Sequence, residues 1–340
     1  MKLAITAILA ATVMAWALLR TGQIAIETQR NGSGRQSPQT RPVTLLEETD
    51  DYRLIKHPLG ETRVPGRPLR IASLSTSAND GLIALGIKPV LAVDSMWTGG
   101  RKTKGYLDDQ LEGVRRLSQS GGTNLEAIYA AHPDLIIAGA RDARAYGQLS
   151  KIAPTICLPS DASGNRELSL LDIGVAIGKE DEARRRFKQY EAKVDAARDE
   201  LAKSAPGEKV TFLRFRRGTC VIYTRTAMFG PLLFDQLKLP PDPRTPDVMH
   251  SGGWDVLSVE RLSTLEADHI FALVDPDSEQ YLDKISQTAI WRDIPAVRAR
   301  QFHRVGADVW LGGDGVIGTE AIVDDVLAAL APPRSEHGSR

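Results

Sequence analysis

The chain has 340 residues, more than one ordinary hydrophobic core accommodates and enough for two domains. Its 43 basic and 43 acidic residues cancel, and its hydrophobic and charged fractions, 42% and 25%, are ordinary for a soluble globular protein. This balance excludes a chain whose overall charge draws it to nucleic acid or to a membrane surface.

The N-terminal residues 1–19 carry Lys2 and then an apolar run from Leu3 to Leu19. The run is near the short limit for a transmembrane helix and slightly long for the core of a signal peptide. A small-x-small cleavage motif lies at Ala15-Trp16-Ala17, and the lack of a nearby cysteine argues against a lipid anchor. Residues 1–19 are therefore predicted to be a signal peptide or an uncleaved membrane anchor, and either one exports the rest.

Residues 20–42 are predicted to be a flexible linker, because 28–42 are polar and lack a hydrophobic period. An N-terminal α/β lobe is predicted over 43–178. Its strand candidates lie at 67–74, 88–94, 135–139 and 153–160, and they alternate with helices at 82–87 and from 125. The groups from Ser75 to Asn79 are expected to cap the first of these helices. Such alternation predicts a parallel sheet covered on both faces.

A long amphipathic helix is predicted at mid-chain. Between 180 and 205, apolar residues recur at spacings of three and four, and Pro206-Gly207 end the pattern. We expect residues 179–206 to connect two lobes, with the second lobe over 207–331 and a tail over 332–340. The stretch "NLEAIYAAHPDLIIAG" (124–139) matches "SVERLSTLEADHIFALV" (258–274) in cap, glutamate, helix and strand, which predicts a structural repeat.

The segment "VTFLRFRRGTC" (210–220) predicts a strand that ends in arginines. Because strand side chains alternate between faces, Arg214 and Arg216 are expected on one face with Phe212, and Arg217 on the other. A guanidinium group is well suited to planar oxyanions, so the first two residues are candidates for an anionic ligand. The alternative is a structural role, in which Arg214 or Arg216 pairs with a surface carboxylate.

The chain resembles the periplasmic substrate-binding proteins of iron–siderophore, haem and cobalamin ABC importers, of the iron(III) dicitrate-binding, helical-hinge class. The resemblance runs from about Leu69 to Leu330. It is carried by the order of "RPLRIASLSTSANDGLIALGIKPVLAVD", "GGTNLEAIYAAHPDLIIAG", "VTFLRF", "LSVERLSTLEADHIF", "IWRDIPAVRARQFHRV" and "DVWLGGDGVIGTEAIVDDVL". It implies an α/β fold of two Rossmann-like lobes with central sheets, joined by a single long α-helix, with the ligand between the lobes.

The resemblance also implies which residues contact the ligand, since the family lines its site with basic and aromatic side chains from strand ends. Carried over to this sequence, these candidates are Trp97, Arg101, Arg141, Arg144, Arg214, Arg216, Tyr223, Arg225 and Trp310. Glu126 and Glu260 hold equivalent places in the repeat, where family members dock on permease arginines. The alternative for both glutamates is an ordinary acidic residue in the first turn of a helix.

The spacing of the cysteines and histidines does not predict a metal site. Cys157 and Cys220 cannot form a CxxC motif; a disulfide is possible, but two free, buried thiols are expected. The six histidines show no HxH or HxxxH grouping, which argues against a zinc or manganese importer. The resemblance implies that the iron is held by its chelator and not directly by the protein. A haem axial role for His250 is conceivable, although a polar loop residue is the simpler interpretation.

The sequence thus predicts an exported, monomeric binding protein without cofactor that captures an anionic ferric siderophore, of catecholate or citrate type, and delivers it to an ABC permease in the inner membrane. No set of nucleophile, base and orienting group is visible, so no enzyme is predicted. Haem or cobalamin binding, an anchored sensor or accessory lobe pair without transport role, and an enzyme on a two-lobed frame are the alternatives.

Overall fold

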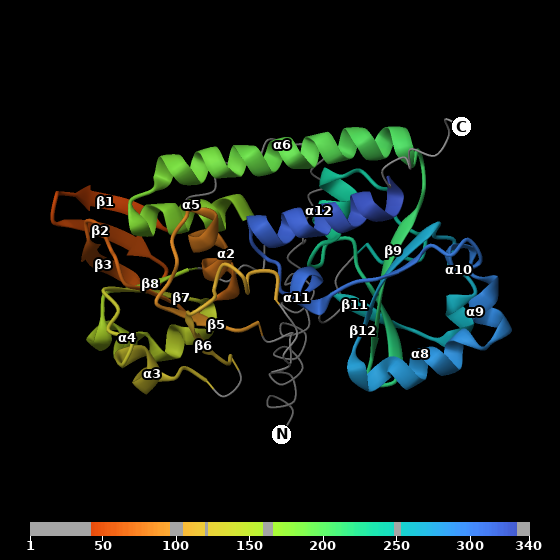
Figure 1. Cartoon of the computed structure of the whole chain (residues 1–340), viewed down its shortest axis with the longest axis horizontal. Coiled ribbons are helices and arrows are strands. Elements are labelled where there is room, and N and C mark those ends of the chain that lie inside the picture. Colours follow the sequence, from red (N-terminus) through yellow and green to blue (C-terminus); the bar gives the residue numbers. More distant parts are fainter. Residues whose placement is uncertain (1–41, 96–104, 120–121, 159–165, 248–252, 332–340) are drawn as a thin grey trace, which may run out of the picture. The chain divides into compact units, whose positions relative to one another are not determined.

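Two five-stranded sheets, one in each half of the chain, form the frame of the protein (Figure 1). The computed structural model describes residues 42–95, 105–119, 122–158, 166–247 and 253–331. The predicted fold class, two α/β lobes joined by one long helix, is confirmed. No helix of the described residues is long and apolar enough to cross a membrane.

The first sheet is parallel, as predicted, with the order β6-β5-β4-β7-β8. Every residue of β4, β5, β7 and β8 is buried, as is typical of a sheet covered by helices on both faces. The strands are β4 (Ile71–Ser73), β5 (Leu91–Val93), β6 (Arg115–Leu117), β7 (Leu135–Ala138) and β8 (Thr155–Cys157). The helices of this half are α2 (Thr76–Ala84), α3 (Leu125–Tyr129), η2 (Ala140–Ala145), α4 (Tyr146–Ile152) and α5 (Arg166–Ile177).

Helix α2 begins earlier than predicted. Its N-cap is Ser75, whose hydroxyl accepts a hydrogen bond from the backbone N–H of Ala78, so the polar residues after it form the first turns and not a preceding loop. Most of this helix is buried, polar residues included, because it lies between the first sheet and the helices α5 and α12.

The second sheet has the order β11-β10-β9-β12-β13 and departs from parallel alternation. Strands β9 and β10 form an antiparallel hairpin, and β11 adds to it antiparallel, whereas β12 and β13 run parallel to β9. The hairpin turn is Arg217-Gly218 with φ of 49° and 68°, and two such residues match the twist of the flanking strands. The strands are β9 (Val210–Arg216), β10 (Thr219–Tyr223), β11 (Trp254–Leu257), β12 (His269–Val274) and β13 (Phe302–Arg304).

The helices of the second half are mostly short. They are the π-helical turn η4 (Pro231–Gln236), α7 (Val259–Leu262), η5 (Pro276–Ser278), α8 (Glu279–Ser286), α9 (Ala289–Asp293), α10 (Pro295–Arg298), α11 (Ala307–Trp310) and α12 (Val316–Leu330). The predicted repeat is visible in their placement. Helix α3 precedes β7 and α7 precedes β12, and each begins at a side-chain cap, Asn124 and Ser258 respectively.

An antiparallel three-stranded meander precedes the first sheet and was not predicted from the sequence. It consists of β1 (Thr44–Glu48), β2 (Tyr52–His57) and β3 (Gly60–Pro65). Its inward face carries Arg53 and His57, both buried, beside Ile55, so the strand lacks the apolar alternation that marks a half-buried strand. Arg53 forms ion pairs with Glu48 and with Glu180 and so ties the meander to the start of the long helix.

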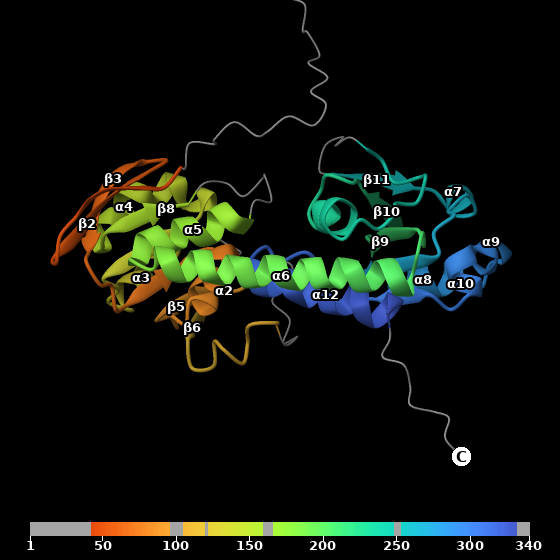
Figure 2. The same ribbon diagram turned by 90° about the horizontal axis from the view of Figure 1, so that it is seen from above.

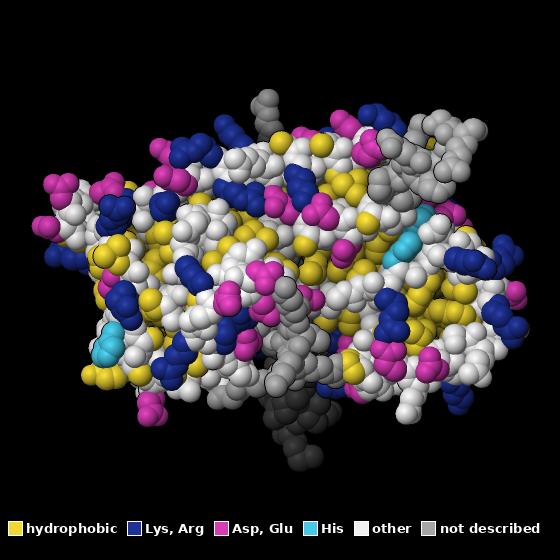
Figure 3. Space-filling view, viewed as in Figure 1, with side chains coloured by type: hydrophobic (Ala, Val, Ile, Leu, Met, Phe, Trp, Pro, Cys, Tyr) yellow, Lys and Arg dark blue, Asp and Glu magenta, His cyan; other side chains and the backbone are white. Residues whose placement is uncertain are grey.

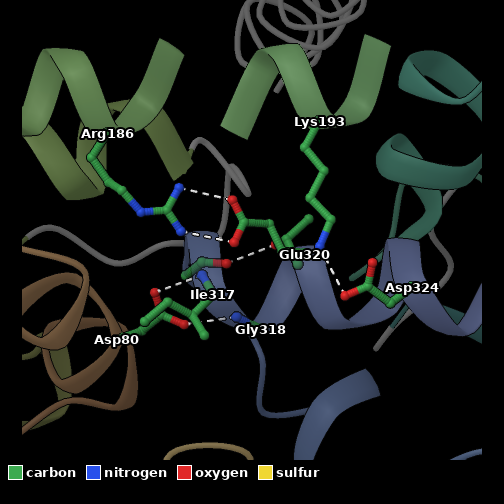
Figure 4. Close-up of polar contacts among 9 residues, drawn as sticks. Asp80, Arg186, Lys193, Ile317, Gly318, Glu320 and Asp324 are labelled. Carbon is green, nitrogen blue, oxygen red and sulfur yellow. Dashed lines mark hydrogen bonds and ion pairs between the residues drawn. The ribbon is translucent and has the colours of Figure 1, made fainter. Parts of the chain in front are cut away.

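The long helix α6 (Glu180–Ser204) packs along α12 (Figures 1 and 2). Arg186 of α6 forms two hydrogen bonds of 2.8 Å with the carboxylate of Glu320, and Lys193 lies 2.8 Å from Asp324 (Figure 4). These two α12 residues are one turn apart and face α6. The ion pairs therefore fix the register of the two helices.

The N-terminus of α12 is held by a residue of the first half. The carboxylate of Asp80, on α2, accepts hydrogen bonds from the backbone N–H groups of Ile317 and Gly318 at 3.0 and 2.9 Å (Figure 4). Burial raises the pKa of Asp80, and these two hydrogen bonds oppose that rise. Asp80 therefore joins the first sheet's helix layer to a helix that also packs on the second half.

Candidate ligand-binding site

Arg214 lies near the end of β9 on the predicted face, next in alternation to Phe212. Its Nε and Nη2 donate to the two carboxylate oxygens of Asp275 at 2.9 and 2.8 Å, and Nη1 lies 3.5 Å from the Tyr223 hydroxyl. The Arg214 side chain is 8% exposed and Asp275 directly follows β12. The guanidinium group therefore joins the ends of two adjacent strands through a paired, charge-neutralising contact.

Arg216 shares this face but has a different partner. Its guanidinium carbon lies 5.3 Å from the centre of the Trp254 ring. Trp254 is the first residue of β11 and pairs with Tyr223 of β10, so the indole lies on the face of the sheet that carries Arg214 and Arg216. Arg216 is half-buried, and within the part of the chain that the structure describes its guanidinium group makes no hydrogen bond or ion pair.

Tyr223 and Arg225 lie in different environments, one buried and one partly exposed. Tyr223 is buried and packs edge-on against Phe212, with ring centres 5.3 Å apart. Arg225 lies beyond the end of β10, with 39% of its side chain exposed and nitrogens 3.8 Å from Asp235 and from Asp247. The structure thus brings Tyr223 together with the two arginines of β9, whereas Arg225 has acidic neighbours of its own.

Trp310 lies in the hydrophobic core, at the end of α11. It stacks on Phe212 and Phe271 with ring centres 5.3 and 5.0 Å apart, and its Nε1–H donates to Asp325 at 2.8 Å. Only 2% of the residue is exposed. In this conformation the indole offers no surface to a ligand, because its aromatic neighbours cover it.

A pocket of about 230 Å³ lies in the first half, where Leu74, Val93 and Leu117 end or follow the parallel strands β4, β5 and β6. Carboxyl ends of strands are where open parallel sheets place ligands. The exposed guanidinium group of Arg141 lies on the rim and donates to Gln119 at 3.4 Å. The pocket therefore combines apolar walls with polar groups, among them the guanidinium group of Arg141 and the carboxylate of Asp142, as small-molecule sites commonly do.

The neighbours of Arg141 have distinct roles. Asp142 accepts from the Thr123 hydroxyl at 2.7 Å and so fixes the loop that carries the pocket's rim. Arg144 is exposed and makes no hydrogen bond or ion pair with any described residue. Trp97, Arg101 and His250 lie outside the described residues, so their predicted roles stay predictions.

Glu126 and Glu260 take equivalent positions, as the repeat predicted. Each is the second residue of a short helix, α3 or α7, and each is exposed. The pKa of Glu260 is lowered by hydrogen bonds to its own backbone N–H and to Ser258. Both carboxylates are therefore accessible, and the hydrogen bonds of Glu260 favour its charged form.

Neither a disulfide nor a metal-binding cluster is found among the residues that the structure describes. Cys157 and Cys220 are free and buried, which confirms that prediction, and burial raises the pKa of both thiols. Among the described residues, no three His, Cys, Asp or Glu side chains come together in a way that could hold a metal ion.

Comparison with known proteins places this geometry in a family. The family model described as periplasmic binding protein matches residues 71–309. The chain belongs to this family. The meander β1–β3 and the body of α12 lie outside the matched range.

Three proteins similar to this periplasmic binding protein carry names that refer to iron chelates or siderophores. The probable siderophore-binding lipoprotein YfiY of Bacillus subtilis is 28% identical over 81% of this chain and 86% of its own, and the Fe(3+)-citrate-binding protein YfmC of the same organism is 29% identical over 87% and 91%. The crystal structure of Staphylococcus aureus SirA complexed with staphyloferrin B is 30% identical, covers 82% of this chain and 98% of its own, and superimposes with a TM-score of 0.66. The first two are thus named for binding a siderophore or Fe(3+)-citrate, and the third was crystallised with a bound staphyloferrin B.

Two contacts of the site were not found in the sequence. Trp254 follows Gly252 and Gly253 in the sequence and gave no strand signal, because only four residues form β11. Asp275 is 61 residues from Arg214, so their pairing depends on the adjacency of β9 and β12. The apolar run 270–274 predicted the strand before Asp275 but not its neighbour in the sheet.

Proposed function

We propose that this periplasmic binding protein captures an anionic ferric siderophore, of citrate or catecholate type, and delivers it to an ABC permease. The observation that carries the proposal is Arg216, a half-buried guanidinium group whose N–H donors make no hydrogen bond to any described residue, on a strand end of the second half. Carboxylate and catecholate oxygens are the groups that such donors bind best.

The relatives support the same ligand class. YfmC is named for Fe(3+)-citrate, and SirA was crystallised with staphyloferrin B. Arg141 adds a second cation at the rim of a pocket in the first half whose lining is partly apolar and partly polar. No catalytic step is proposed, because the chemistry required is recognition and release of an intact chelate.

Titration calorimetry of the purified protein tests this proposal with a panel of ferric citrate, a ferric catecholate, a ferric hydroxamate, haem and cobalamin. We expect saturable binding of the citrate or catecholate complex. Arg216→Met should weaken that binding about 10- to 100-fold, the loss of one charge-assisted contact. Saturable binding of haem or cobalamin alone would overturn the proposal, and binding of none would favour an accessory role without transport.

We further propose that Glu126 and Glu260 dock on basic residues of the permease. Their equivalence in the repeat and their exposure support a contact made once by each lobe. Reversal of both charges, Glu126→Lys with Glu260→Lys, should abolish siderophore-dependent iron uptake while the affinity for the chelate stays unchanged. The exposed Glu112→Lys is the matched control. Uptake at the wild-type rate in the double variant would contradict the docking role.

A further inference from the structure

The two arginines on one face of β9 differ in what holds them. Arg214 uses its Nε and one Nη on a single carboxylate, that of Asp275. Arg216 lies over the ring of Trp254 instead, 5.3 Å from its centre. Both side chains are therefore oriented, but only the first is electrically neutralised by its partner.

An aromatic partner has a chemical consequence that a carboxylate does not have. A cation over an indole is attracted by the electron density of the ring face, and this attraction uses none of the guanidinium N–H groups as hydrogen-bond donors. Within the described residues, the donors of Arg216 have no other partner. No described residue competes with an anion for these donors, while the long side chain is still held in place.

The sheet register explains why Trp254 can hold this arginine. Tyr223 pairs with Trp254 and Val221 with Val256, so the two β11 residues lie on the same face as Arg214 and Arg216. Val256 is 55% exposed and Trp254 is half-buried, and this part of the face is therefore open to solvent. An anion can approach the guanidinium group from that side.

We propose that Trp254 is a positioning residue that orients Arg216 for an anionic oxygen of the ligand, and that the Arg214–Asp275 pair is structural support for the strand ends. The proposal rests on the proposed function. It assigns specificity to one arginine, because among the described residues Arg216 brings to this face a charge that no carboxylate pairs with. A site built in this way selects anionic chelates over neutral ones.

A double-mutant cycle on the full chain tests the coupling. By titration calorimetry with ferric citrate, Trp254→Leu should weaken binding about 3- to 10-fold and Trp254→Phe much less, because Phe retains an aromatic face. The double variant Trp254→Leu/Arg216→Met should bind no more weakly than Arg216→Met. Any binding of a neutral ferric hydroxamate should have the same affinity in the wild type and in all of these variants. Arg217→Met is the matched control, because the structure places this arginine in the exposed hairpin turn after β9 and not on the other face of the strand as predicted.

A second measurement does not need the chelate. Iodide, an anion, should quench the Trp254 fluorescence (wild type minus Trp254→Phe) more strongly than neutral acrylamide does, and Arg216→Met should abolish this preference. Three results would each overturn the positioning role. The first is a loss of affinity in the double variant that equals the product of the two single losses, and the second is an equal loss of affinity for Trp254→Leu and Trp254→Phe. The third is an iodide preference that Arg216→Met leaves unchanged. Failure of the wild type to bind any chelate would instead contradict the proposed function and leave the iodide test to decide.

Discussion

The buried His57 shows how one side chain is held in a single protonation state. Its Nδ1 accepts from the backbone N–H groups of Leu59 and Cys157 at 3.3 and 3.4 Å, so the proton is on Nε2, which donates to the Thr62 hydroxyl at 2.9 Å. A second proton would have to enter at Nδ1, against two donors. Burial lowers the pKa of His57, and this arrangement acts in the same direction.

A pH dependence of stability follows from this histidine. The unfolded chain takes up the proton near the ordinary pKa of about 6.5 and the folded chain only at lower pH. The contribution of His57 is therefore complete above pH 6.5 and is lost as pH falls toward the lowered folded pKa, with a slope of at most about 1.4 kcal/mol per pH unit. Urea denaturation of wild type and His57→Asn between pH 7.5 and 5 should show a smaller slope in the variant. His132→Asn, at an exposed residue, should keep the wild-type slope.

Arg214 and Arg216 should also differ in stability measurements. Arg214→Met leaves the poorly exposed carboxylate of Asp275 without its partner, and we expect a loss of about 3 kcal/mol in the free energy of unfolding. Arg216→Met breaks no ion pair among the described residues and should cost less than about 1 kcal/mol. Urea denaturation of both variants provides the comparison. Equal losses would show that Arg216 is also a structural residue.

At the scale of the element, Asp80 of the first half caps helix α12, which also packs on the second half. Asp80→Ala would leave the N–H groups of Ile317 and Gly318 without an acceptor at a buried helix end. We expect a loss of about 2 kcal/mol in the free energy of unfolding and faster amide exchange at those two residues. Asp181→Ala, in the exposed first turn of α6, is the control and should change stability little. Unchanged exchange at both amides would contradict the capping role.

The elements also show how far the sequence could lead. Strand alternation placed Arg214 and Arg216 on one face correctly, and the 3.6-residue period located α6, because both signals are local. The meander was missed because Arg53 and His57 occupy its inward face, and their burial depends on distant partners such as Glu180. Trp310 was predicted at the ligand site, but four packed aromatic and acidic neighbours, brought together by the fold, cover it.

At the scale of the whole molecule, one hydrophobic cluster extends across both halves of the chain beneath a surface of mixed charge. Basic and acidic side chains are interspersed on the face shown in Figure 3, in keeping with the equal numbers of the two in the sequence. One hydrophobic cluster contains Ile71 and Ile137 of the first sheet, Ile322 of α12 and Phe212 of the second sheet. A second cluster, around Leu265, lies within the second half. The large cluster makes the stability of each half depend on the other.

This shared core should make residues 42–331 unfold as one cooperative unit. Ile322→Ala removes a buried side chain of the shared cluster, and Leu265→Ala one that only the second half uses; each should cost about 2–5 kcal/mol. Native-state hydrogen exchange would follow the slowest amides of β7 and β12 in both variants. If the halves unfold together, Leu265→Ala lowers the protection of β7 as much as that of β12. Protection of β7 that stays at the wild-type level in Leu265→Ala would show instead that the two sheets unfold independently and that α6 and α12 only tether them.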